Sequence, residues 1–236
     1  MKPYFQSDLV TLYLGDCRDQ LLGLPSESVD LMLTGPPYGM AYEGRGQRAA
    51  AIRADGSRQG MRVLRQALTA AGPSLAADAH ALVFCHWSSW PDFTDAVAAH
   101  LKMKGALIWW KNRGGVGDCT GSYAPDYEVL LHAVGGKRRP LVGKRMVAVL
   151  AGFAPVPPPK RLHPTEKPVS LLRLLIERSC PAGGLVLDPF AGSGSTLVAA
   201  QQLGRRAVGV ELEERYCEAA ARRLEQALHE GQPQVA

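Results

Sequence analysis

The stretch LVLDPFAGSGSTLVAA, residues 185–200, carries the strongest fold signal in the chain. An aliphatic run ends in an acidic residue, a turn with Gly192 and Gly194 follows, and an apolar helical pattern comes next. A strand, a glycine-containing turn and a helix in this order bring backbone N–H groups close to a bound cofactor. The turn lacks both the GxxxxGK[ST] pattern of a phosphate loop and the GxGxxG pattern of a dinucleotide fold. The stretch therefore predicts binding of a nucleoside ligand without a dedicated phosphate-binding loop.

An acidic residue follows at a spacing that suits a nucleoside. Glu211 ends the next aliphatic run, AVGVE, seventeen residues after Gly194. Its carboxylate can accept two hydrogen bonds from ribose hydroxyls. By themselves the glycine turn and Glu211 are weak support for nucleoside binding, because a plain tight turn with a surface glutamate explains them equally well.

Outward from this unit, short aliphatic and β-branched runs alternate with helical patterns, which is typical of an α/β domain around a mostly parallel sheet. The runs 104–111 and 128–133 are joined by a glycine-rich link, so we expect an antiparallel hairpin at one edge of the sheet. Seven strands are expected, at residues 9–14, 29–34, 81–85, 106–111, 128–133, 185–188 and 207–211. Helices are expected at about residues 61–71, 92–102, 168–179, 195–203 and 213–229.

Composition restricts the class of protein. The 236 residues are 46% hydrophobic and 21% charged, which suits a single folded domain that needs no disulfides. The five cysteines are scattered and form no CxxC pair, which argues against a disulfide framework and a zinc site. No apolar run approaches the roughly 20 residues that span a bilayer, and the start lacks a signal core. We therefore expect a cytoplasmic protein with no metal and no membrane partner.

Two stretches match neither a helix nor a strand. Residues 39–60 are glycine-rich and are expected to form a long mobile loop. A proline-rich segment over residues 135–168 is expected to be an inserted surface segment. Residues 137–167 carry a charge of +7, whereas the whole chain carries +5, so the remainder carries −2. Such concentrated charge favours an anionic partner, although solvated loops are the alternative.

A second motif, VDLMLTGPPYGM, ends a hydrophobic run in Gly35, Pro36, Pro37 and Tyr38. Consecutive prolines fix φ and remove two N–H donors, so nearby carbonyls point outward beside the aromatic ring. A base taken out of a duplex could stack on Tyr38 while its amino group donates to the carbonyl of Gly35 or Pro36. In isolation, a turn that ends the strand is the more common explanation.

Five motifs then occur in one order: YLGDC at 13–17, LPSESVDLMLTGPPYG at 24–39, HPTEKP at 163–168, DPFAGSGST at 188–196 and VGVELEERYCEAAARRL at 208–224. Together they resemble the amino-methylating DNA methyltransferases that use S-adenosylmethionine. The order is similar to the permuted β group of that family, whose target-recognition segment lies between the catalytic and cofactor motifs. The resemblance implies a Rossmann-like methyltransferase fold, with a seven-stranded mixed sheet and helices on both faces. It also implies one catalytic domain over residues 1–236, with the mobile loop 39–60 and a basic target-recognition insertion at about 135–162.

The resemblance also assigns roles to residues. Residues 188–196 would hold the methionine end of S-adenosylmethionine, Glu211 the ribose, Asp16 with Cys17 the adenine, and Thr165 with Lys167 the cofactor carboxylate. His163 has either a positioning role or a plain turn role. The implied cofactor-binding residues are Asp16, Cys17, Thr165, Lys167, Asp188, Phe190, Ala191, Gly192, Ser193, Gly194, Ser195, Thr196, Glu211 and Leu212. The implied catalytic residues are Gly35, Pro36, Pro37 and Tyr38, and the implied DNA-binding residues are Arg45, Arg48, Lys137, Arg138, Arg139, Lys144 and Arg145.

One residue departs from the family pattern. Members usually begin the catalytic motif with Asp, Asn or Ser, whose side chain accepts a hydrogen bond from the target amino group, and this chain has Gly35. The expected activity is methylation of the exocyclic amino group of adenine in double-stranded DNA, with cytosine second. A catalytically impaired DNA-binding module of the same fold and an unrelated nucleotide-dependent enzyme such as a reductase are the alternatives. A homodimer is common in similar enzymes.

Overall fold

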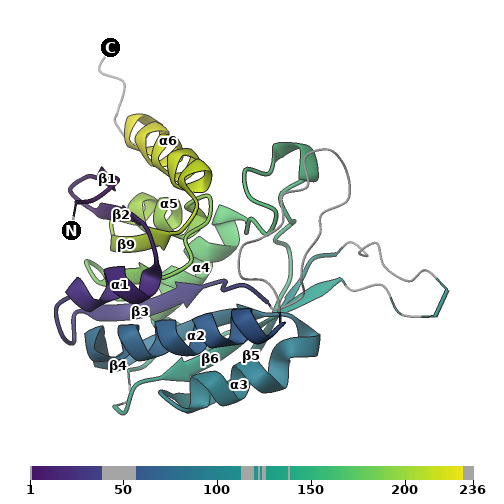
Figure 1. The fold of residues 1–236 in the computed structure, drawn as a ribbon. Helices are drawn as coiled ribbons and strands as arrows, with labels where there is room; N and C mark the ends of the chain where they lie inside the picture. The colour runs from purple at the N-terminus through teal and green to yellow at the C-terminus, as the bar shows by residue number, and fades with distance from the viewer. Residues whose placement is uncertain are drawn as a thin grey trace.

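A nine-stranded mixed sheet forms the centre of the protein in the computed structural model (Figure 1). The model describes residues 2–38, 57–112, 120–121, 123, 126–137 and 139–230, apart from the side chains of residues 57, 58 and 230. The strands are β1 (Phe5–Gln6), β2 (Val10–Leu14), β3 (Val29–Thr34), β4 (Leu75–Cys85), β5 (Lys102–Trp110), β6 (Tyr127–Val134), β7 (Val149–Leu150), β8 (Leu185–Asp188) and β9 (Arg206–Glu211). The helices are α1 (Cys17–Gln20), α2 (Ser57–Ala71), α3 (Trp90–Ala98), α4 (Val169–Ser179), α5 (Ser195–Gln202) and α6 (Glu214–Glu230), with four short 3-10 turns between elements.

The strand order is β1-β2-β9-β8-β3-β4-β6-β5-β7. Strands β2, β9, β8, β3 and β4 run parallel, β6 is antiparallel to both β4 and β5, β7 is parallel to β5, and β1 is antiparallel to β2. The α/β class and the antiparallel pairing of β5 with β6 are confirmed. The hairpin does not form the outermost edge, because β7 pairs with β5 at Ile108 and Trp109.

The expected count of seven strands was wrong by two. The extra strands β1 and β7 have two residues each, too few to show an alternating pattern in the sequence. Strand β5 begins at Lys102, so the helix expected to reach residue 102 ends earlier, at Ala98. Helix α2 begins at Ser57, inside the expected loop 39–60, and the rest of that loop lies outside the described residues.

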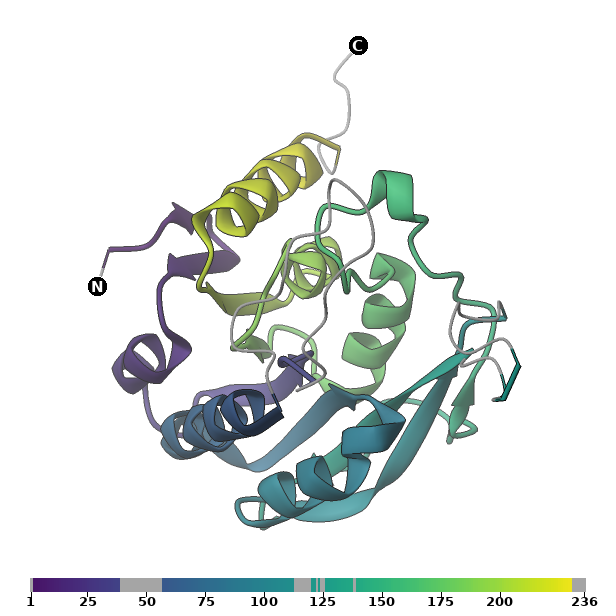
Figure 2. The ribbon, with the colours of Figure 1, turned by 45° about the vertical axis from the view of Figure 1, so that its right-hand side comes forward.

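Helices cover both faces of the sheet, as expected. Helices α4, α5 and α6 pack together on one face, and α2 and α3 lie on the other (Figures 1 and 2). Each face has its own apolar core: Leu172 and Leu224 belong to the first, and Leu64 and Phe93 to the second. Successive side chains of the buried strands point to opposite faces of the sheet, and they therefore pack into two separate apolar cores.

The centre of the sheet contains a topological switch point. Strands β8 and β3 are parallel neighbours, with Leu31 opposite Val186. From β3 the chain passes through α2 to β4 on one side, and from β8 it passes through α5 to β9 on the other. The loops that leave these two strands diverge at the carboxyl end of the sheet. Ligands of open α/β sheets bind in the crevice that this divergence leaves.

Within the described ranges, no helix is long and apolar enough to cross a bilayer. Among the same residues, no cluster of three or more His, Cys, Asp or Glu side chains is arranged to hold a metal ion.

Candidate active site

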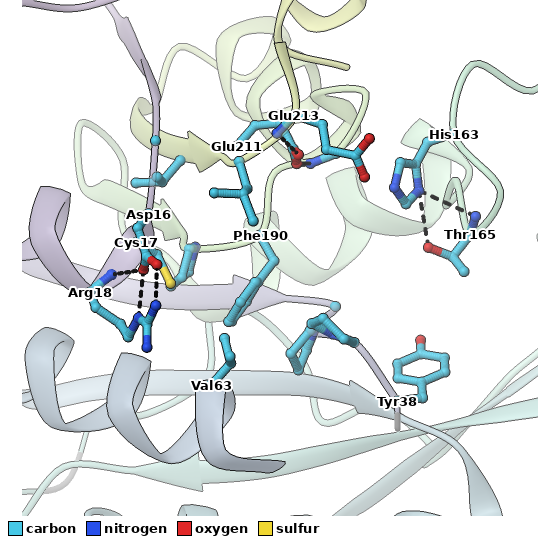
Figure 3. A pocket seen from close by; sticks show the side chains of 18 of the residues that line it. Asp16, Cys17, Arg18, Tyr38, Val63, His163, Thr165, Phe190, Glu211 and Glu213 are labelled. Carbon is cyan, nitrogen blue, oxygen red and sulfur yellow. Dashed lines mark hydrogen bonds and ion pairs between the residues drawn. The ribbon is translucent and has the colours of Figure 1, made fainter. Parts of the chain in front are cut away.

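A cavity of about 200 Å³ opens at the switch point (Figure 3). Loops that follow β2, β3, β8 and β9 all contribute to its lining. In Figure 3, Asp16, Cys17 and Arg18 lie at one end, His163 and Thr165 at the other, and Phe190 between them. The two sequence motifs are thereby brought together, because Pro36, Pro37 and Tyr38 line the same cavity as Gly192 and Glu211.

The turn after β8 can be formed only with glycine at its last position. Gly194 has a φ of +77°, and a Cβ added there would lie 2.8 Å from the Cβ of Ala220 on α6. The turn is also braced by Arg223, whose guanidinium donates to the carbonyl of Ser193 at 2.8 Å and to the hydroxyl of Ser195 at 3.0 Å. Sequence reasoning missed Arg223, because the helical pattern of α6 gives no sign that this side chain turns inward.

Asp188 joins the two strands of the switch point. Its Oδ1 accepts from the Thr34 hydroxyl at 2.7 Å and from the Phe190 N–H at 3.1 Å. Burial raises the pKa of this carboxyl, and the hydrogen bonds from Thr196 and Thr34 partly oppose that rise. Asp188 therefore fixes where the loop after β8 starts relative to β3.

Glu211 is buried at the end of β9 and faces the cavity. Its Oε2 accepts from the Gly192 N–H and its Oε1 from the Glu213 N–H, each at 2.8 Å. Burial raises its pKa, and these backbone donors oppose the rise. The carboxylate thus shapes the glycine turn and keeps further lone pairs on both oxygens for a ligand hydroxyl.

At the other end of the cavity, Asp16 caps helix α1. Its Oδ1 accepts from the Arg18 N–H at 2.9 Å, and the carboxylate forms an ion pair with the Arg18 side chain. Arg18 also donates to the Gln66 side chain of α2 at 2.9 Å. The neighbouring Cys17 thiol is buried, which raises its pKa to about 12. This end therefore combines one held carboxylate with a neutral thiol.

His163 packs across the glycine turn. A Cβ on Gly192 would lie 3.4 Å from the His163 ring, and the ring meets Tyr216 edge-on with centroids 4.3 Å apart. Its Nδ1 lies 3.1 Å from the Thr165 hydroxyl. Burial, with Lys167 and Arg215 nearby, lowers the pKa of His163 to about 4. His163 is therefore neutral at pH 7 and orients Thr165, which favours the positioning role.

This lowered pKa gives a testable dependence of stability on pH. Below about pH 6.5 the unfolded chain binds a proton at residue 163 before the folded chain does, so His163 costs about 2 kcal/mol of stability by pH 5. In urea unfolding at pH 7 and pH 5, His163→Asn is expected to lose less stability between the two pH values than the native chain. The matched control is His100→Asn, an exposed position outside this cavity. If both variants show the native pH dependence, His163 is not the group responsible.

A smaller cavity of about 50 Å³ adjoins the first and shares His163, Thr165, Phe190 and Gly192 with it. Ser193, Ser195 and Thr196 of the glycine turn also line it, and so does Lys167. Thr165 and Lys167, which the sequence assigned to a cofactor carboxylate, therefore lie together beside that turn. Ala191 lies there too, whereas Leu212 is 45% exposed and lines only the larger cavity.

A buried carboxylate lies next to Tyr38. Glu128 on β6 accepts from the Tyr38 hydroxyl at 2.9 Å and forms ion pairs with Lys111 at 2.7 Å and Lys167 at 3.0 Å. The Lys167 ammonium also lies over the rings of Tyr38 and Phe84, 5.4 and 5.1 Å from their centroids. Burial alone would raise the pKa of Glu128, but Lys167 and Lys111 outweigh it and lower the pKa to about 2. Sequence reasoning missed Glu128, although one acid in the apolar strand YEVLLHAV was a signal.

Gly35 leaves room beside the base-stacking motif. A Cβ built there would have one neighbour within 4 Å, the Cβ of Phe84 at 3.9 Å, which is an ordinary contact. Gly35 lines both cavities. A Cβ at position 35 would therefore meet no steric clash.

The first part of the basic insertion lies away from the active-site cavity. The chain leaves β6 at the amino end of the parallel strands, and the N–H of Lys137 donates to the carbonyl of Ala77 at 2.7 Å. Arg139 forms ion pairs with Asp30 and Asp78 at 2.8 and 2.6 Å, near the starts of β3 and β4. Lys144 and Arg145 precede β7, whose two residues lie beside Ile108 and Trp109.

The physical reason is the direction of β6. Because β6 is antiparallel to β4, the residues that follow it return to the end of the sheet opposite the active-site cavity. Arg45, Arg48 and Arg138 lie outside the described residues. The residues that reach the cavity end are those after β7, where Trp109 donates to the carbonyl of Phe153 at 2.8 Å and Arg161 to that of Val156 at 2.6 Å.

The fold and this cavity define a doubly wound α/β protein with a nucleoside-type pocket at its switch point. Residues 29–222 match the N6_N4_Mtase family, described as DNA methylase. Putative methylase YubD of Escherichia coli (strain K12) is 34% identical over 212 residues, which cover 89% of this chain and 88% of that protein. The chain belongs to this family of DNA methylases.

Other similarities agree with this assignment. Type II methyltransferase M.ScaI of Streptomyces caespitosus is 25% identical over 256 residues, covering 95% of this chain and 84% of that protein. A crystal structure of the M1.HpyAVI–SAM complex has a TM-score of 0.72 at 22% identity and covers 92% of this chain and 99% of its own. PvuII DNA methyltransferase (cytosine-N4-specific) has a TM-score of 0.77 at 14% identity, covering 97% and 93% of the two chains. At these identities the two solved structures establish the fold.

Proposed function

We propose that this DNA methylase transfers a methyl group from S-adenosylmethionine to the exocyclic amino group of adenine in double-stranded DNA, with cytosine as the second target. The observation that carries the proposal is the shared cavity, because the glycine turn and Glu211 line the same opening as Pro36, Pro37 and Tyr38. A nucleoside cofactor and a flipped base held there would meet at Gly35, which lines both adjoining cavities.

The residues present fit S-adenosylmethionine. The larger cavity offers the Glu211 carboxylate for ribose hydroxyls, Phe190 as an apolar wall, and Asp16 with Cys17 at its far end. The smaller cavity offers Lys167 and the hydroxyls of the glycine turn for an amino-acid carboxylate. The cofactor supplies a methyl group on a positively charged sulfur. Among the described residues, four cysteines, including Cys17, are buried and free, which suits a reducing cytoplasm.

The chain's own residues act mainly by positioning. The target base leaves the duplex and stacks on Tyr38, and its amino group donates to backbone carbonyls at Gly35 and Pro36. The nitrogen–methyl bond would form as the methyl–sulfur bond breaks and leaves a neutral thioether, and the nitrogen would then release one proton to solvent. No covalent bond to the protein is needed in this step. The rings of Tyr38, Phe84 and Phe190 line the two cavities and give this step apolar walls.

Glu128 and the two lysines hold Tyr38 for stacking. The Tyr38 hydroxyl is tied to an ionised carboxylate, so the plane of the ring is fixed before a base arrives. Tyr38→Phe keeps the aromatic face and loses this hydrogen bond. We expect kcat for methyl transfer to fall about tenfold, with the KM for S-adenosylmethionine unchanged.

Steady-state kinetics with labelled cofactor would test this expectation. The control is Tyr127→Phe, which removes the hydroxyl of a more exposed tyrosine on the same strand as Glu128. A Tyr38→Phe enzyme with native kcat would show that the hydroxyl does not position the ring.

The DNA surface is proposed at the carboxyl end of the sheet. Tyr38 and Gln59 both line the cavity. Arg45 and Arg48 lie outside the described residues and stay in the proposed DNA contact on the resemblance, joined by Lys160 and Arg161 from the segment after β7. For Lys137, Arg139, Lys144 and Arg145, DNA contact stays a prediction, apart from the active-site cavity, because the chain that follows β6 leads toward the opposite end of the sheet.

Gly35 supports a second candidate, a catalytically impaired DNA-binding module of the same fold. No side chain at position 35 can accept a hydrogen bond from the target amino group, which commonly costs on the order of a hundredfold in rate. Such a module would bind both S-adenosylmethionine and DNA but transfer the methyl group very slowly.

Calorimetry with S-adenosylmethionine and NAD in parallel tests the cofactor assignment. We expect binding of S-adenosylmethionine with one site per chain and no heat from NAD. Binding of NAD alone would exclude the methyltransferase proposal and favour a reductase.

A further inference from the structure

A third cavity, of about 650 Å³, lies at the end of the sheet opposite the active site. It is bounded by β4, β5, β6 and the chain that follows β6. Its lining contains Lys102, Lys104, Lys137, Arg139 and Arg145, and none of the described residues that line it is acidic. Strand β6, with Glu128 at the active-site end and Val134 at this end, separates the two sites by about 20 Å.

One of these basic side chains, Arg139, has a structural role in the wall of the cavity. Arg139 pairs with Asp30 and Asp78, the two acids at the adjacent ends of β3 and β4. Side-chain hydrogen bonding to Arg139 lowers the pKa of Asp78. Within the described part of the chain, Lys102, Lys104, Lys137 and Arg145 form no ion pair. Positive charge is therefore left uncompensated around an open space.

Two histidines also line the cavity. The Nδ1 of His80 lies 3.0 Å from the Nε2 of His132, and their rings stack with centroids 5.2 Å apart. Burial lowers the pKa of both, that of His132 to about 4 with the charge of His80 and Lys104 contributing. At pH 7 the pair is thus neutral, with a single proton between the facing nitrogens.

The pair leaves one buried nitrogen unsatisfied. His80 is 2% exposed, and its Nε2 has no hydrogen-bond partner among the described residues. When His132 donates to His80, that Nε2 carries a proton and needs an acceptor. An unmade bond of this kind is costly, and an anionic oxygen would satisfy it. Solvated surface lysines alone would not account for this orphaned group.

We propose that this cavity is a second anion site, which binds a phosphate-bearing ligand independently of the active site. Lysine ammonium groups around a histidine donor match the charge and the several acceptor oxygens of phosphate. The phosphates belong either to a free ligand or to the backbone of DNA that passes this end of the protein. The site gives a function to the part of the basic segment that the active site does not use.

Titration with sodium tripolyphosphate tests the site directly. Lys102→Gln/Lys104→Gln removes two lining charges from β5, and Lys2→Gln/Arg222→Gln removes two exposed charges near β1 and on α6. We expect the first pair to weaken binding at least tenfold by calorimetry and the second to change it less than twofold. Equal weakening in both variants, or no binding to the native chain, would overturn the proposal.

Histidine NMR supplies a readout that unspecific charge attraction would not move. A bound anion beside His80 and His132 favours their protonated forms, so the midpoint of their titration is expected to move to higher pH when tripolyphosphate is added. The charges that surround the pair are those of Lys102, Lys104, Lys137, Arg139 and Arg145, with Asp30 and Asp78 paired to Arg139. An unchanged titration with ligand bound elsewhere would contradict the assignment.

A short DNA duplex distinguishes the two sources of phosphate. Duplex binding that tripolyphosphate displaces, and that Lys102→Gln/Lys104→Gln weakens, identifies the DNA backbone as the occupant. Duplex binding that neither affects, with tripolyphosphate still bound, identifies a free phosphate-bearing ligand. Because the cavity is remote from Tyr38 and Glu211, kcat for methyl transfer is expected to stay native in this variant. A negative result for anion binding would therefore not affect the proposed methyl transfer, and a negative result for methyl transfer would not affect the proposed anion site.

Discussion

Gly35→Asp is expected to raise the rate of methyl transfer to DNA by about a hundredfold. The new carboxylate supplies the acceptor that position 35 lacks, and a positioned acceptor in an active site has an effect of this order. A Cβ at position 35 makes only an ordinary contact with Phe84, and the position lines both active-site cavities. Single-turnover transfer of labelled methyl groups, with cofactor and DNA saturating, measures the rate without the influence of product release.

Gly35→Ala is the matched control for this gain. It introduces the same Cβ and the same restriction of the backbone but no acceptor, so its rate is expected to equal that of the native chain. A gain in both variants would attribute the effect to backbone stiffening. A loss in Gly35→Asp would show that this active site works through a glycine-specific arrangement, and it would refute the missing-acceptor explanation.

Glu211→Ala is expected to weaken S-adenosylmethionine binding by at least a hundredfold. The carboxylate accepts from the Gly192 and Glu213 N–H groups at 2.8 Å, so its removal leaves both donors without an acceptor. The removal also deletes the proposed contact with the ribose. The proposed ribose contact consists of two hydrogen bonds to a charged group, which contribute about 1.5–3 kcal/mol each, so its loss corresponds to two or more orders of magnitude in affinity. Calorimetry gives the affinity, and thermal unfolding shows whether the variant is folded.

Two further variants separate binding from stability. Glu211→Gln keeps one acceptor oxygen and is expected to bind the cofactor with an intermediate affinity. Glu214→Gln alters an exposed glutamate just after the site and should bind as the native chain does. Native affinity in Glu211→Ala would place the cofactor elsewhere than at the switch point.

The glycine turn was predictable from the sequence because its requirements are local. A strand end, a positive φ at Gly194 and an acid at the end of the next strand all follow from a short stretch of chain. The GPPY motif at residues 35–38 was visible for the same reason. Their convergence on one cavity follows from the parallel pairing of β3 with β8.

The contacts that the sequence did not reveal are between distant residues. Tyr38 reaches Glu128 across 90 positions, and Arg139 reaches Asp78 across 61. The charge distribution along the sequence located the basic segment between the catalytic and cofactor motifs. It did not predict at which end of the sheet the segment lies. That position depends on the direction of β6. The antiparallel hairpin that we expected from the sequence implies this direction, and it follows that Lys137 and Arg139 lie away from the active site.

The most direct test of the central claim is nucleoside analysis of DNA after incubation with the native chain and isotopically labelled S-adenosylmethionine. Saturating cofactor and long incubation compensate for the slow transfer that Gly35 implies. We expect labelled N6-methyladenine as the main product, absent from reactions with Tyr38→Ala. Label in the ring carbon of cytosine, or label in no nucleoside with either the native chain or Gly35→Asp, would contradict transfer to an exocyclic amino group.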